Sequence, residues 1–355
     1  MKILTVVGAR PQFVKAATIS RVISNSLVHS EDILHTGQHF DENMSDVFFT
    51  EMDIPKPKYQ LDLKSRTHGA MTGEILAGVE QILLQNKYDC VLVYGDTNST
   101  LAGALAAAKL HIPIAHVEAG LRSFNMKMPE EINRILTDRI SKFLFCPTVT
   151  AMNNLKKEGY DFMPVHIAHT GDVMYDAALF YAQNSEQKAK VFKSFHEKFA
   201  LCTIHRAENT DDEKKLSDIF KALKIISEKM KIILPLHPRT QQKLKQLNLD
   251  TNGIKLIDPV GYYDMLQLLK NCEVVLTDSG GLQKEAYFFH KPCITLREET
   301  EWVELVEVGH NQIVGTDVKK IVNAFSNPNS QVNVTNLYGD GHSAEAIVQY
   351  LEKYL

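Results

Sequence analysis

The sequence lacks several features on which large classes of proteins depend. Its five cysteines are widely spaced and none forms a CxxC pair, which argues against a zinc ribbon or a thioredoxin-like site. The chain has no GxGxxG fingerprint and no recognisable metal cluster, which disfavours a dinucleotide cofactor and a bound metal. Its formal net charge of −4 gives no overall electrostatic reason to bind nucleic acid or an anionic membrane. We therefore expect no cofactor, no metal, and no nucleic-acid or membrane partner.

Long hydrophobic runs are missing as well. The N-terminal segment is apolar for only about six residues before Arg10, which is too short for the core of a signal peptide or for a membrane span. Four of the cysteines lie in short apolar runs that are typical of buried strands, and this fits a reducing compartment. Together these features predict a cytoplasmic protein.

The composition is that of a folded protein, with 44% hydrophobic and 23% charged residues. At 355 residues the chain is too long for one ordinary core and suits two domains of roughly 150 to 200 residues each. Short apolar runs alternate with longer amphipathic segments, and this alternation predicts an α/β fold with parallel sheets. Nine such runs cover residues 3–9, 90–96, 113–120, 143–148, 200–206, 232–237, 255–260, 274–280 and 293–297. Most of them end in polar or glycine-bearing turns, as expected at the sheet edge where α/β proteins bind ligands.

The alternation is interrupted once, around residues 160–175, where the periodicity is lost and Pro164, Gly159 and Gly171 occur. We place a domain boundary there, near residue 170. The expected architecture is two doubly wound domains, residues 1–170 and 171–342, that face each other across a cleft. The last segment, residues 343–355, spaces its apolar residues along one helical face and is expected to pack back on the first domain.

Candidate functional residues of the first half follow the ends of the predicted strands. Arg10 and Lys15 accompany a GARPQ turn, in which a glycine and an early proline would let backbone amides and two cations face an anion. Asp96 ends another apolar run at the expected ligand edge. Glu118 ends a third run, and an apolar strand rarely carries a glutamate without a partner or a task. Glu130 lies in the first turn of an expected helix.

Each of these candidates also has a purely structural interpretation. The GARPQ turn is compatible with an ordinary strand-to-helix connection. Asp96 would serve as a helix N-cap, Glu118 as one half of a structural salt bridge, and Glu130 as a complement to a helix dipole. If the three carboxylates lie near one sheet edge, repulsion and partial burial would raise the pKa of at least one of them. Such a cluster suits proton transfer at carbon.

The second half contributes the segments HRAEN, HPR and DSGGLQKE, which begin at His205, His237 and Asp278. The last is the most specific, because a strand that ends in Asp-Ser-Gly-Gly lets the backbone approach a phosphate at the start of the following helix. Ser279 adds a hydroxyl, and Glu285 is placed to accept hydrogen bonds from ribose hydroxyls. The alternative interpretation of this segment is a tight glycine turn in front of a buried helix.

Taken together and in order, the motifs resemble the non-hydrolysing UDP-N-acetylglucosamine 2-epimerases along nearly the whole chain. The matching segments are GARP with Lys15, YGDTNST, AHVEAGLRS, PEEINR, TIHRAEN, LPLHPR and TDSGGLQKEA. The resemblance implies two Rossmann-like domains in a GT-B-like arrangement, with UDP held mainly by the second domain. It also suggests a homodimer that serves bacterial surface polysaccharide synthesis in the cytoplasm.

The resemblance also carries roles to individual positions of this chain. The catalytic set that it implies is Asp96, Glu118, Glu130 and His205. The substrate-binding positions that it implies are Arg10, Lys15, Arg134, Arg206, His237, Ser279, Gly280, Gly281 and Glu285. In the reaction of the family, UDP leaves carbon 1 while a base removes the carbon-2 proton, and UDP is added back to the 2-acetamidoglucal after protonation from the opposite face. This chemistry needs two oppositely placed acid/base groups, together with cations and amides that hold the diphosphate.

The chain departs from the usual pattern of the family in three places, one of which is the segment Gln38–Met44. Typical members have GTRPE at the first turn and a longer insert before PEE, whereas this chain has GARPQF and the short stretch Ser123–Met128. These features are similar to the branch that acts on UDP-2,3-diacetamido-2,3-dideoxy-glucuronate. They leave open which of the two UDP-sugars is the substrate and whether a regulatory second UDP-sugar site exists. A GT-B glycosyltransferase, a hydrolysing epimerase and a non-catalytic sugar-nucleotide sensor are the competing functions.

Overall fold

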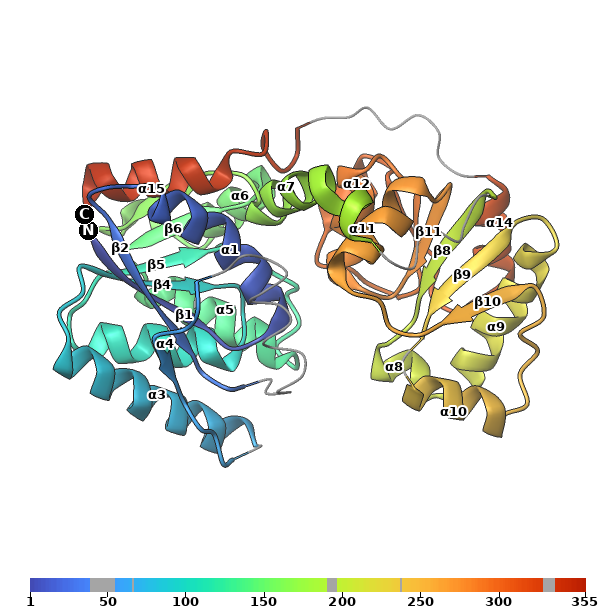
Figure 1. Cartoon of the computed structure of the whole chain (residues 1–355), viewed down its shortest axis with the longest axis horizontal. Helices are drawn as coiled ribbons and strands as arrows, with labels where there is room; N and C mark the ends of the chain where they lie inside the picture. Colours follow the sequence, from blue (N-terminus) through green and yellow to red (C-terminus); the bar gives the residue numbers. More distant parts are fainter. Residues whose placement is uncertain (39–54, 66, 190–196, 237, 328–335) are drawn as a thin grey trace. The chain divides into compact units, whose positions relative to one another are not determined.

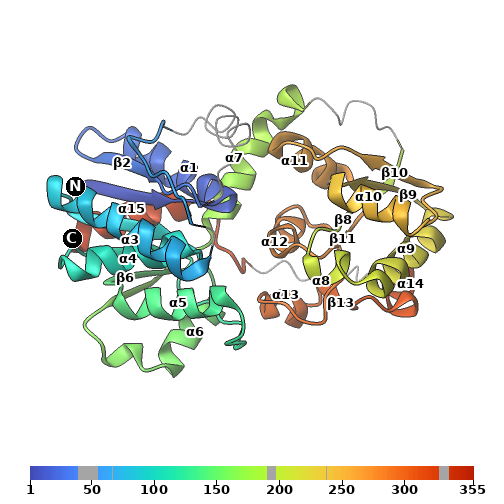
Figure 2. The same ribbon diagram turned by 90° about the horizontal axis from the view of Figure 1, so that it is seen from below.

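The computed structural model describes residues 1–38, 55–65, 67–189, 197–236, 238–327 and 336–355. The chain divides into two compact units (Figure 1). Unit 1 comprises Met1–Ala177 and Asn336–Leu355, and unit 2 comprises Ala178–Thr335. Each unit is built on a parallel sheet with helices on both faces, which confirms the predicted α/β class (Figure 2). No helix in the described part of the chain has the length and hydrophobicity needed to cross a membrane.

The sheet of unit 1 has the strand order β3-β2-β1-β4-β5-β6-β7, and all its neighbours pair in parallel. Its strands are β1 (Lys2–Val7), β2 (Ser30–His35), β3 (Tyr59–Gln60), β4 (Cys90–Tyr94), β5 (Ile114–Val117), β6 (Phe143–Cys146) and β7 (His166–His169). The order reverses between β1 and β4, which is the switch point at which doubly wound sheets bind ligands. The turn after β1 leads into α1 at Arg10, and the turn after β4 carries Asp96.

Two helical layers cover this sheet. Its helices are α1 (Arg10–Ser24), α3 (His68–Gln85), α4 (Asn98–Lys109), α5 (Pro129–Ile140), α6 (Val149–Lys157), the short 3-10 helix η1 (Tyr160–Phe162), the first part of α7 (Val173–Lys188), and α15 (Ser343–Tyr354). The alanine-rich α4 lies close to β1, because a Cβ on Gly103 would be only 3.1 Å from the Val6 side chain. The C-terminal helix α15 contacts α1, and its Tyr350 and Tyr354 pack on His166 of β7.

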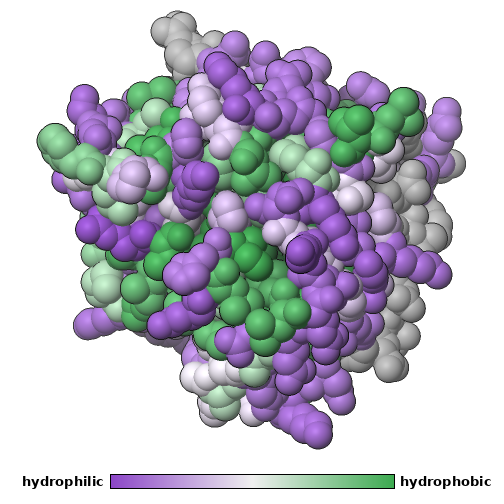
Figure 3. All heavy atoms as spheres, turned by 90° about the vertical axis from the view of Figure 1, so that its left-hand side faces the viewer, coloured by the Kyte–Doolittle hydropathy of each residue, from purple (hydrophilic) through white to green (hydrophobic). Residues whose placement is uncertain are grey.

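One face of unit 1 exposes apolar side chains. Figure 3 shows hydrophobic side chains gathered in the lower part of this face, where Figures 1 and 2 place α3, α4 and α5. The large exposed hydrophobic residues of these helices are Leu84, Ile132 and Leu136. Ile132 and Leu136 lie one turn apart on α5 and therefore share one stripe of that helix.

The sheet of unit 2 has the order β10-β9-β8-β11-β12-β13, again with parallel neighbours. Its strands are β8 (Phe199–Thr203), β9 (Lys231–Pro235), β10 (Ile254–Ile257), β11 (Val274–Thr277), β12 (Cys293–Thr295) and β13 (Asn311–Ile313). Its helices after α7 are α8 (Ala207–Thr210), α9 (Glu213–Ser227), α10 (Pro238–Gln246), α11 (Tyr262–Asn271), α12 (Gly280–Phe288), α13 (Val303–Glu307) and α14 (Val318–Ser326). The order reverses between β8 and β11, and the turns after these strands carry His205 and Ser279.

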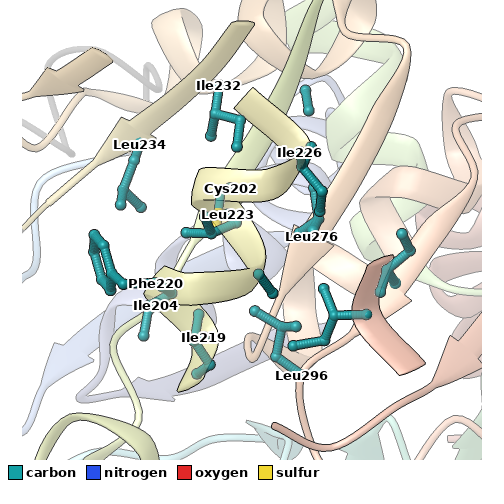
Figure 4. Packing of buried hydrophobic residues seen from close by; sticks show 14 of the residues in the cluster. Cys202, Ile204, Ile219, Phe220, Leu223, Ile226, Ile232, Leu234, Leu276 and Leu296 are labelled. Atoms are coloured by element: carbon teal, nitrogen blue, oxygen red, sulfur yellow. The ribbon is translucent and has the colours of Figure 1, made fainter. Parts of the chain in front are cut away.

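Strands β8, β11 and β12 of unit 2 are buried along their whole length, which explains why they are almost continuously apolar. On one face, α9 packs Phe220 and Leu223 against strand residues that include Leu234 and Leu276 (Figure 4). On the other face, the neighbouring strand residue Ile233 packs in a second cluster with residues of α11 and α12. Alternate residues of each strand therefore belong to different cores.

All nine predicted apolar runs contain a strand, but four strands were not predicted. β2, β3, β7 and β13 are short or only partly buried, so they carry no apolar run. Residues 160–175, where the sequence loses its periodicity and where we placed the domain boundary, contain η1, β7 and the start of α7. β7 is an edge strand of the first sheet, and the division between the units falls at Ala177, inside α7.

Candidate active site

The turn after β1 is closed by Gln12, a buried residue that the sequence analysis did not single out. Its Oε1 accepts hydrogen bonds from the backbone N–H groups of Gly8 (2.8 Å) and Ala9 (3.0 Å), and its Nε2 donates to the backbone oxygen of Tyr94 (2.7 Å). Gln12 thus joins the turns after β1 and β4. The prediction that the backbone amides of this turn face an anion is wrong for Gly8 and Ala9, because Gln12 occupies both. The side chain of Arg10 lies outside the described residues.

Lys15 and Glu118 form an ion pair beside the turn after β4. Both side chains are about nine-tenths buried, and they come from α1 and from the end of β5. Glu118 has a φ of +74°, which is strained for a residue with a side chain, and its N–H donates to the backbone oxygen of Phe145 (3.1 Å). A Cβ on Gly95 would lie 3.2 Å from Glu118 Oε2, so the carboxylate sits directly against that turn.

Asp96, in the same turn, is held by Arg134 of α5. The guanidinium of Arg134 lies between two carboxylates, with Nη2 2.5 Å from Asp96 Oδ2 and Nη1 2.5 Å from Glu131 Oε2. Asn133 also donates a hydrogen bond to the backbone oxygen of Asp96 (2.9 Å). The Asp96 side chain nevertheless remains 32% exposed. The Glu118 carboxylate thus lies against the turn that carries Asp96; Glu118 pairs with Lys15, and Asp96 shares Arg134 with Glu131.

Glu131 is a buried residue of α5 that was not singled out from the sequence. It accepts hydrogen bonds from the backbone N–H groups of Ser123 and Phe124 (both 2.9 Å), and so holds the loop before α5. Burial alone would raise the pKa of the Glu131 carboxyl, but these N–H groups and Arg134 hold it below its usual value. The available signal was the spacing Glu131-x-x-Arg134, because residues three apart meet on a helix surface.

The predicted carboxylate cluster is only partly present in unit 1. Glu130 has an exposed side chain, and it makes no hydrogen bond or ion pair within the described part of the chain. The expected repulsion among three carboxylates is reduced, because Lys15 pairs with Glu118, and Arg134 pairs with Asp96 as well as with Glu131. Asp96 and Glu118 are therefore each a candidate reactive group and also one half of a salt bridge.

In unit 2, Asp278 organises the turn that carries His205. Its buried carboxylate accepts hydrogen bonds from the backbone N–H groups of His205 and Arg206 and from the Asn209 side chain, each at 3.1 Å. His205 Nδ1 lies 3.2 Å from Asp278 Oδ1, while the His205 side chain is 59% exposed. Burial would raise the pKa of the Asp278 carboxyl, but His205 and these N–H donors lower it. The ring of His205 is thus held at Nδ1 from behind and is open to solvent.

The DSGG turn begins α12 as predicted. Ser279 is the N-cap, and its Oγ accepts a hydrogen bond from the N–H of Leu282 (3.4 Å). The two glycines have different surroundings. A Cβ on Gly280 would lie 2.2 Å from Glu301 Oε1, whereas a Cβ on Gly281 would meet nothing within 4 Å. Only Gly281 therefore has open space beside its backbone.

Glu301 is a second position that the sequence analysis missed. It forms an ion pair with Arg297 (2.8 Å) directly against Gly280. Burial would raise the pKa of Glu301, but Arg297, with Arg206 as a smaller contributor, lowers it. Glu285 is buried in α12, and His237 lies outside the described residues.

The described residues contain no group of three or more His, Cys, Asp or Glu side chains that could hold a metal ion. The five cysteines are buried and unpaired with one another. Burial raises the pKa of their thiols, to about 12 for Cys90, Cys272 and Cys293, so these groups are protonated at neutral pH.

Comparison with known proteins identifies the family of this chain. The model of the UDP-N-acetylglucosamine 2-epimerase family matches residues 23–352. The chain belongs to this family. It is 53% identical to the UDP-2,3-diacetamido-2,3-dideoxy-D-glucuronate 2-epimerase of Pseudomonas aeruginosa, over 99% of this chain and 100% of that protein. It is 44% identical to the UDP-N-acetylglucosamine 2-epimerase of Methanocaldococcus jannaschii, over 99% of each chain.

Solved structures agree with this family membership. The M. jannaschii UDP-GlcNAc 2-epimerase in complex with UDP-GlcNAc and UDP superimposes with a TM-score of 0.89, over 99% of this chain and 100% of that one. The Neisseria meningitidis UDP-GlcNAc 2-epimerase bound to UDP-GlcNAc, at 30% identity, gives a TM-score of 0.90 over 99% and 100% of the two chains. The predicted family resemblance and the GT-B-like fold are thus confirmed, and this protein is an epimerase that acts on UDP-sugars.

The role of Asp278 in this epimerase can be tested by its pH dependence. Because the folded-state pKa of Asp278 is lowered, its ionised form stabilises unit 2 above the pKa of the unfolded state, about 3.9, and this contribution is lost as the pH falls through the folded pKa. The amide of Asp278→Asn is a poorer acceptor for the buried N–H donors than the carboxylate. The variant should therefore have a free energy of unfolding about 1–3 kcal/mol lower at pH 7. Urea unfolding of both proteins should show this difference shrinking below pH 4. A difference that stays constant from pH 7 to pH 3 would contradict the assignment.

Proposed function

We propose that this epimerase inverts carbon 2 of a UDP-linked N-acetylhexosamine, of the UDP-GlcNAc to UDP-ManNAc type, by eliminating UDP and adding it back. The carbon-2 proton has no adjacent carbonyl and is not acidic enough for direct exchange, so loss of UDP from carbon 1 must accompany its removal. The intermediate is a 2-acetamidoglucal. No net hydride is transferred, and the proposed reaction therefore needs no nicotinamide cofactor.

One observation carries this proposal: the Glu118 carboxylate, paired with Lys15, lies against the turn that carries Asp96, and Arg134 holds Asp96. Two separately held carboxylates are what protonation and deprotonation on opposite faces of carbon 2 require. Each carboxylate is held by a cation and is assigned here to proton transfer at carbon 2. Glu130, with its exposed side chain, remains a candidate for the third acid/base role.

In unit 2 we assign His205 to the catalytic set and the α12 N-terminus to the diphosphate. A ring held at Nδ1 by Asp278 presents Nε2 for proton transfer or for a hydrogen bond to the leaving group. Arg206 is held through its Nε by the backbone oxygen of Asp278 (3.1 Å), which leaves the end of its guanidinium to pair with an anion. The free backbone face at Gly281 and the dipole of α12 favour the same kind of ligand.

The substrate is proposed at two levels. UDP-N-acetylglucosamine is the general candidate, and UDP-2,3-diacetamido-2,3-dideoxy-glucuronate is favoured by the 53% identity to the Pseudomonas enzyme. The uronate carries a carboxylate that needs a cation. Lys127, exposed in the loop just before α5, is the candidate. An ion pair worth about 1.5–3 kcal/mol would give roughly ten- to hundredfold discrimination.

We predict that the protein incorporates solvent deuterium at carbon 2 of its substrate while interconverting the two epimers. The measurement is proton NMR in deuterated water with each of the two UDP-sugars, in the parent and in Lys127→Ala. Lys127→Ala should lower kcat/KM for the uronate about ten- to hundredfold and leave that for UDP-GlcNAc unchanged.

Other outcomes of this experiment support the competing functions. Release of free ManNAc and UDP would indicate a hydrolysing epimerase. Binding without deuterium incorporation would indicate a sensor, and turnover only after addition of an acceptor would indicate a glycosyltransferase. If the parent and Lys127→Ala preferred UDP-GlcNAc to the same extent, the uronate would be rejected as the substrate.

The two glycines of the DSGG turn provide a matched test of UDP binding. Gly281→Ala adds a methyl group into open space, so it should leave the fold intact and weaken UDP binding by obstructing the backbone amides. Gly280→Ala instead displaces Glu301 and is the less specific variant. Calorimetric titration with UDP, alongside a thermal melt, measures both effects. If Gly281→Ala bound UDP as tightly as the parent, the turn would not be the diphosphate site.

We also propose that the protein forms a homodimer through the apolar face of α3, α4 and α5. The exposed Leu84, Ile132 and Leu136 support this, because contiguous apolar patches commonly mark interfaces. Leu136→Glu should shift the sedimentation coefficient toward that of a monomer, whereas Lys245→Glu, on the exposed surface of α10, should not. A monomeric parent, or an unchanged Leu136→Glu variant, would reject this surface.

A further inference from the structure

The completely buried His116 has a hydrogen-bonding pattern that is unusual for a neutral imidazole. It lies in β5, two residues before Glu118, and none of its side chain is exposed. Its Nδ1 is 2.7 Å from Asp138 Oδ1, and its Nε2 is 2.7 Å from the backbone oxygen of Gly95. A carboxylate and a carbonyl oxygen are both acceptors. Each ring nitrogen can complete its hydrogen bond only if it carries a proton, so the ring satisfies both partners only as an imidazolium.

The charges around His116 balance when the ring is positive. Asp138 Oδ2 also accepts hydrogen bonds from Arg122 Nη1 (2.7 Å) and from the backbone N–H of Gly120 (3.1 Å). Arg122 in turn makes a two-pronged pair with Glu158 (2.7 and 2.8 Å). Two carboxylates and one guanidinium would leave one net negative charge largely in the interior, and a positive His116 cancels it.

Nearby ionisable groups either are neutral or, like Arg139 over the Tyr160 ring (5.6 Å), belong to an exposed residue. Burial raises the pKa of the Cys146 thiol and raises that of Tyr160 to about 12, with Asp138 adding to both effects, so both groups are neutral. On the far side of Gly95, Lys15 and Glu118 neutralise each other. Burial would raise the pKa of Asp138, and the hydrogen bond from His116 contributes most to holding it low instead.

Through this network the His116 side chain connects the turn that carries Asp96 with the segment that carries Glu118. The carbonyl of Gly95 precedes Asp96 directly, and the Gly95 N–H donates to the backbone oxygen of Val117 (3.0 Å). Gly95 itself has a φ of +61°, a conformation that its neighbours must maintain. Asp138 meanwhile holds the N–H of Gly120, two residues after Glu118. His116 therefore completes a bridge between the turn of Asp96 and the segment of Glu118.

We propose that His116 is a buried imidazolium that positions Asp96 by holding the carbonyl oxygen of Gly95. It touches no substrate and acts through the turn, so it is a positioning residue. The effect on turnover rests on the proposed function, whereas the protonation state does not.

The first experiment measures protonation directly in the full-length protein. With 15N-labelled imidazole rings, one histidine should keep both ring nitrogens protonated at pH 8, where an ordinary histidine is mostly neutral. That signal should be missing in His116→Gln and present in His342→Gln, a control at an exposed histidine. The signal that is present in the parent and missing in His116→Gln belongs to His116. If that signal is the signal of a neutral tautomer, the imidazolium is ruled out. This result does not depend on any activity.

The second experiment compares two variants with the same loss of charge. The amide nitrogen of His116→Gln falls near the place of Nε2 and retains a donor for Gly95, whereas that of His116→Asn falls near Nδ1 and retains a donor for Asp138. His116→Asn should lower kcat for the UDP-sugar by about one to two orders of magnitude with little change in KM, because a small misplacement of a reacting group is costly. His116→Gln should retain most of the kcat.

Thermal melts show whether either variant is unfolded, and kcat is compared at a temperature at which both are folded. Equal losses of kcat in folded Asn and Gln variants would overturn the positioning role and leave His116 as a structural residue. A parent without activity would instead contradict the proposed function, while the protonation measurement would stand.

Discussion

The candidate site depends on one kind of interaction, in which buried carboxylates accept hydrogen bonds from the backbone N–H groups of loops. Glu131 holds the loop before α5, and Asp278 holds the turn of His205. Loops at the end of a sheet have few backbone partners of their own, because strand pairing ends where they begin. A carboxylate behind such a loop satisfies several N–H groups at once and fixes the direction of the side chains that the loop carries. Arg134 pairs with Glu131, which limits the cost of burying that carboxylate.

This arrangement separates reactive groups from those that hold them. The PEE motif shows the division at neighbouring positions, with Glu130 exposed to solvent and Glu131 buried against Arg134. Arg134 then spans from Glu131 to Asp96, so the position of a candidate base depends on a residue that is itself held from behind. The same logic applies in unit 2, where the buried Asp278 supports the exposed His205. A side chain that must exchange protons with a substrate needs access, whereas its support needs burial.

The two turns of unit 1 also illustrate how glycine permits close approach. Gly95 brings the Lys15–Glu118 pair against the backbone next to Asp96, and Gly8 lets the Ser99 hydroxyl pack on the first turn. A side chain at Gly8 would clash at 2.1 Å with the hydroxyls of Ser99 and Thr36. With both turns packed this closely, Gln12 reaches across the switch point and joins them. Its neutral amide both donates and accepts there, which a carboxylate in the same place would not do.

Much of the architecture was predictable from the sequence by itself. Strands buried on both faces are apolar at most positions, so the runs that became β1, β4, β8 and β11 were visible without a structure. The order of motifs likewise determined the family, because each matching segment follows a strand at the ligand edge. β7 and β13 were not visible, since their residues are only partly buried and carry no apolar run.

The tertiary structure alone decided which polar residues share a partner. Glu130 and Glu131 are adjacent glutamates in one helical turn, and only the position of Arg134 and of the preceding loop separates their roles. The hydrogen bond between His116 and Asp138 joins positions far apart in the sequence, and no local sequence pattern indicates such a contact. Hydrogen bonds depend on distance and direction between atoms that folding brings together, whereas periodicity records only which residues face a core.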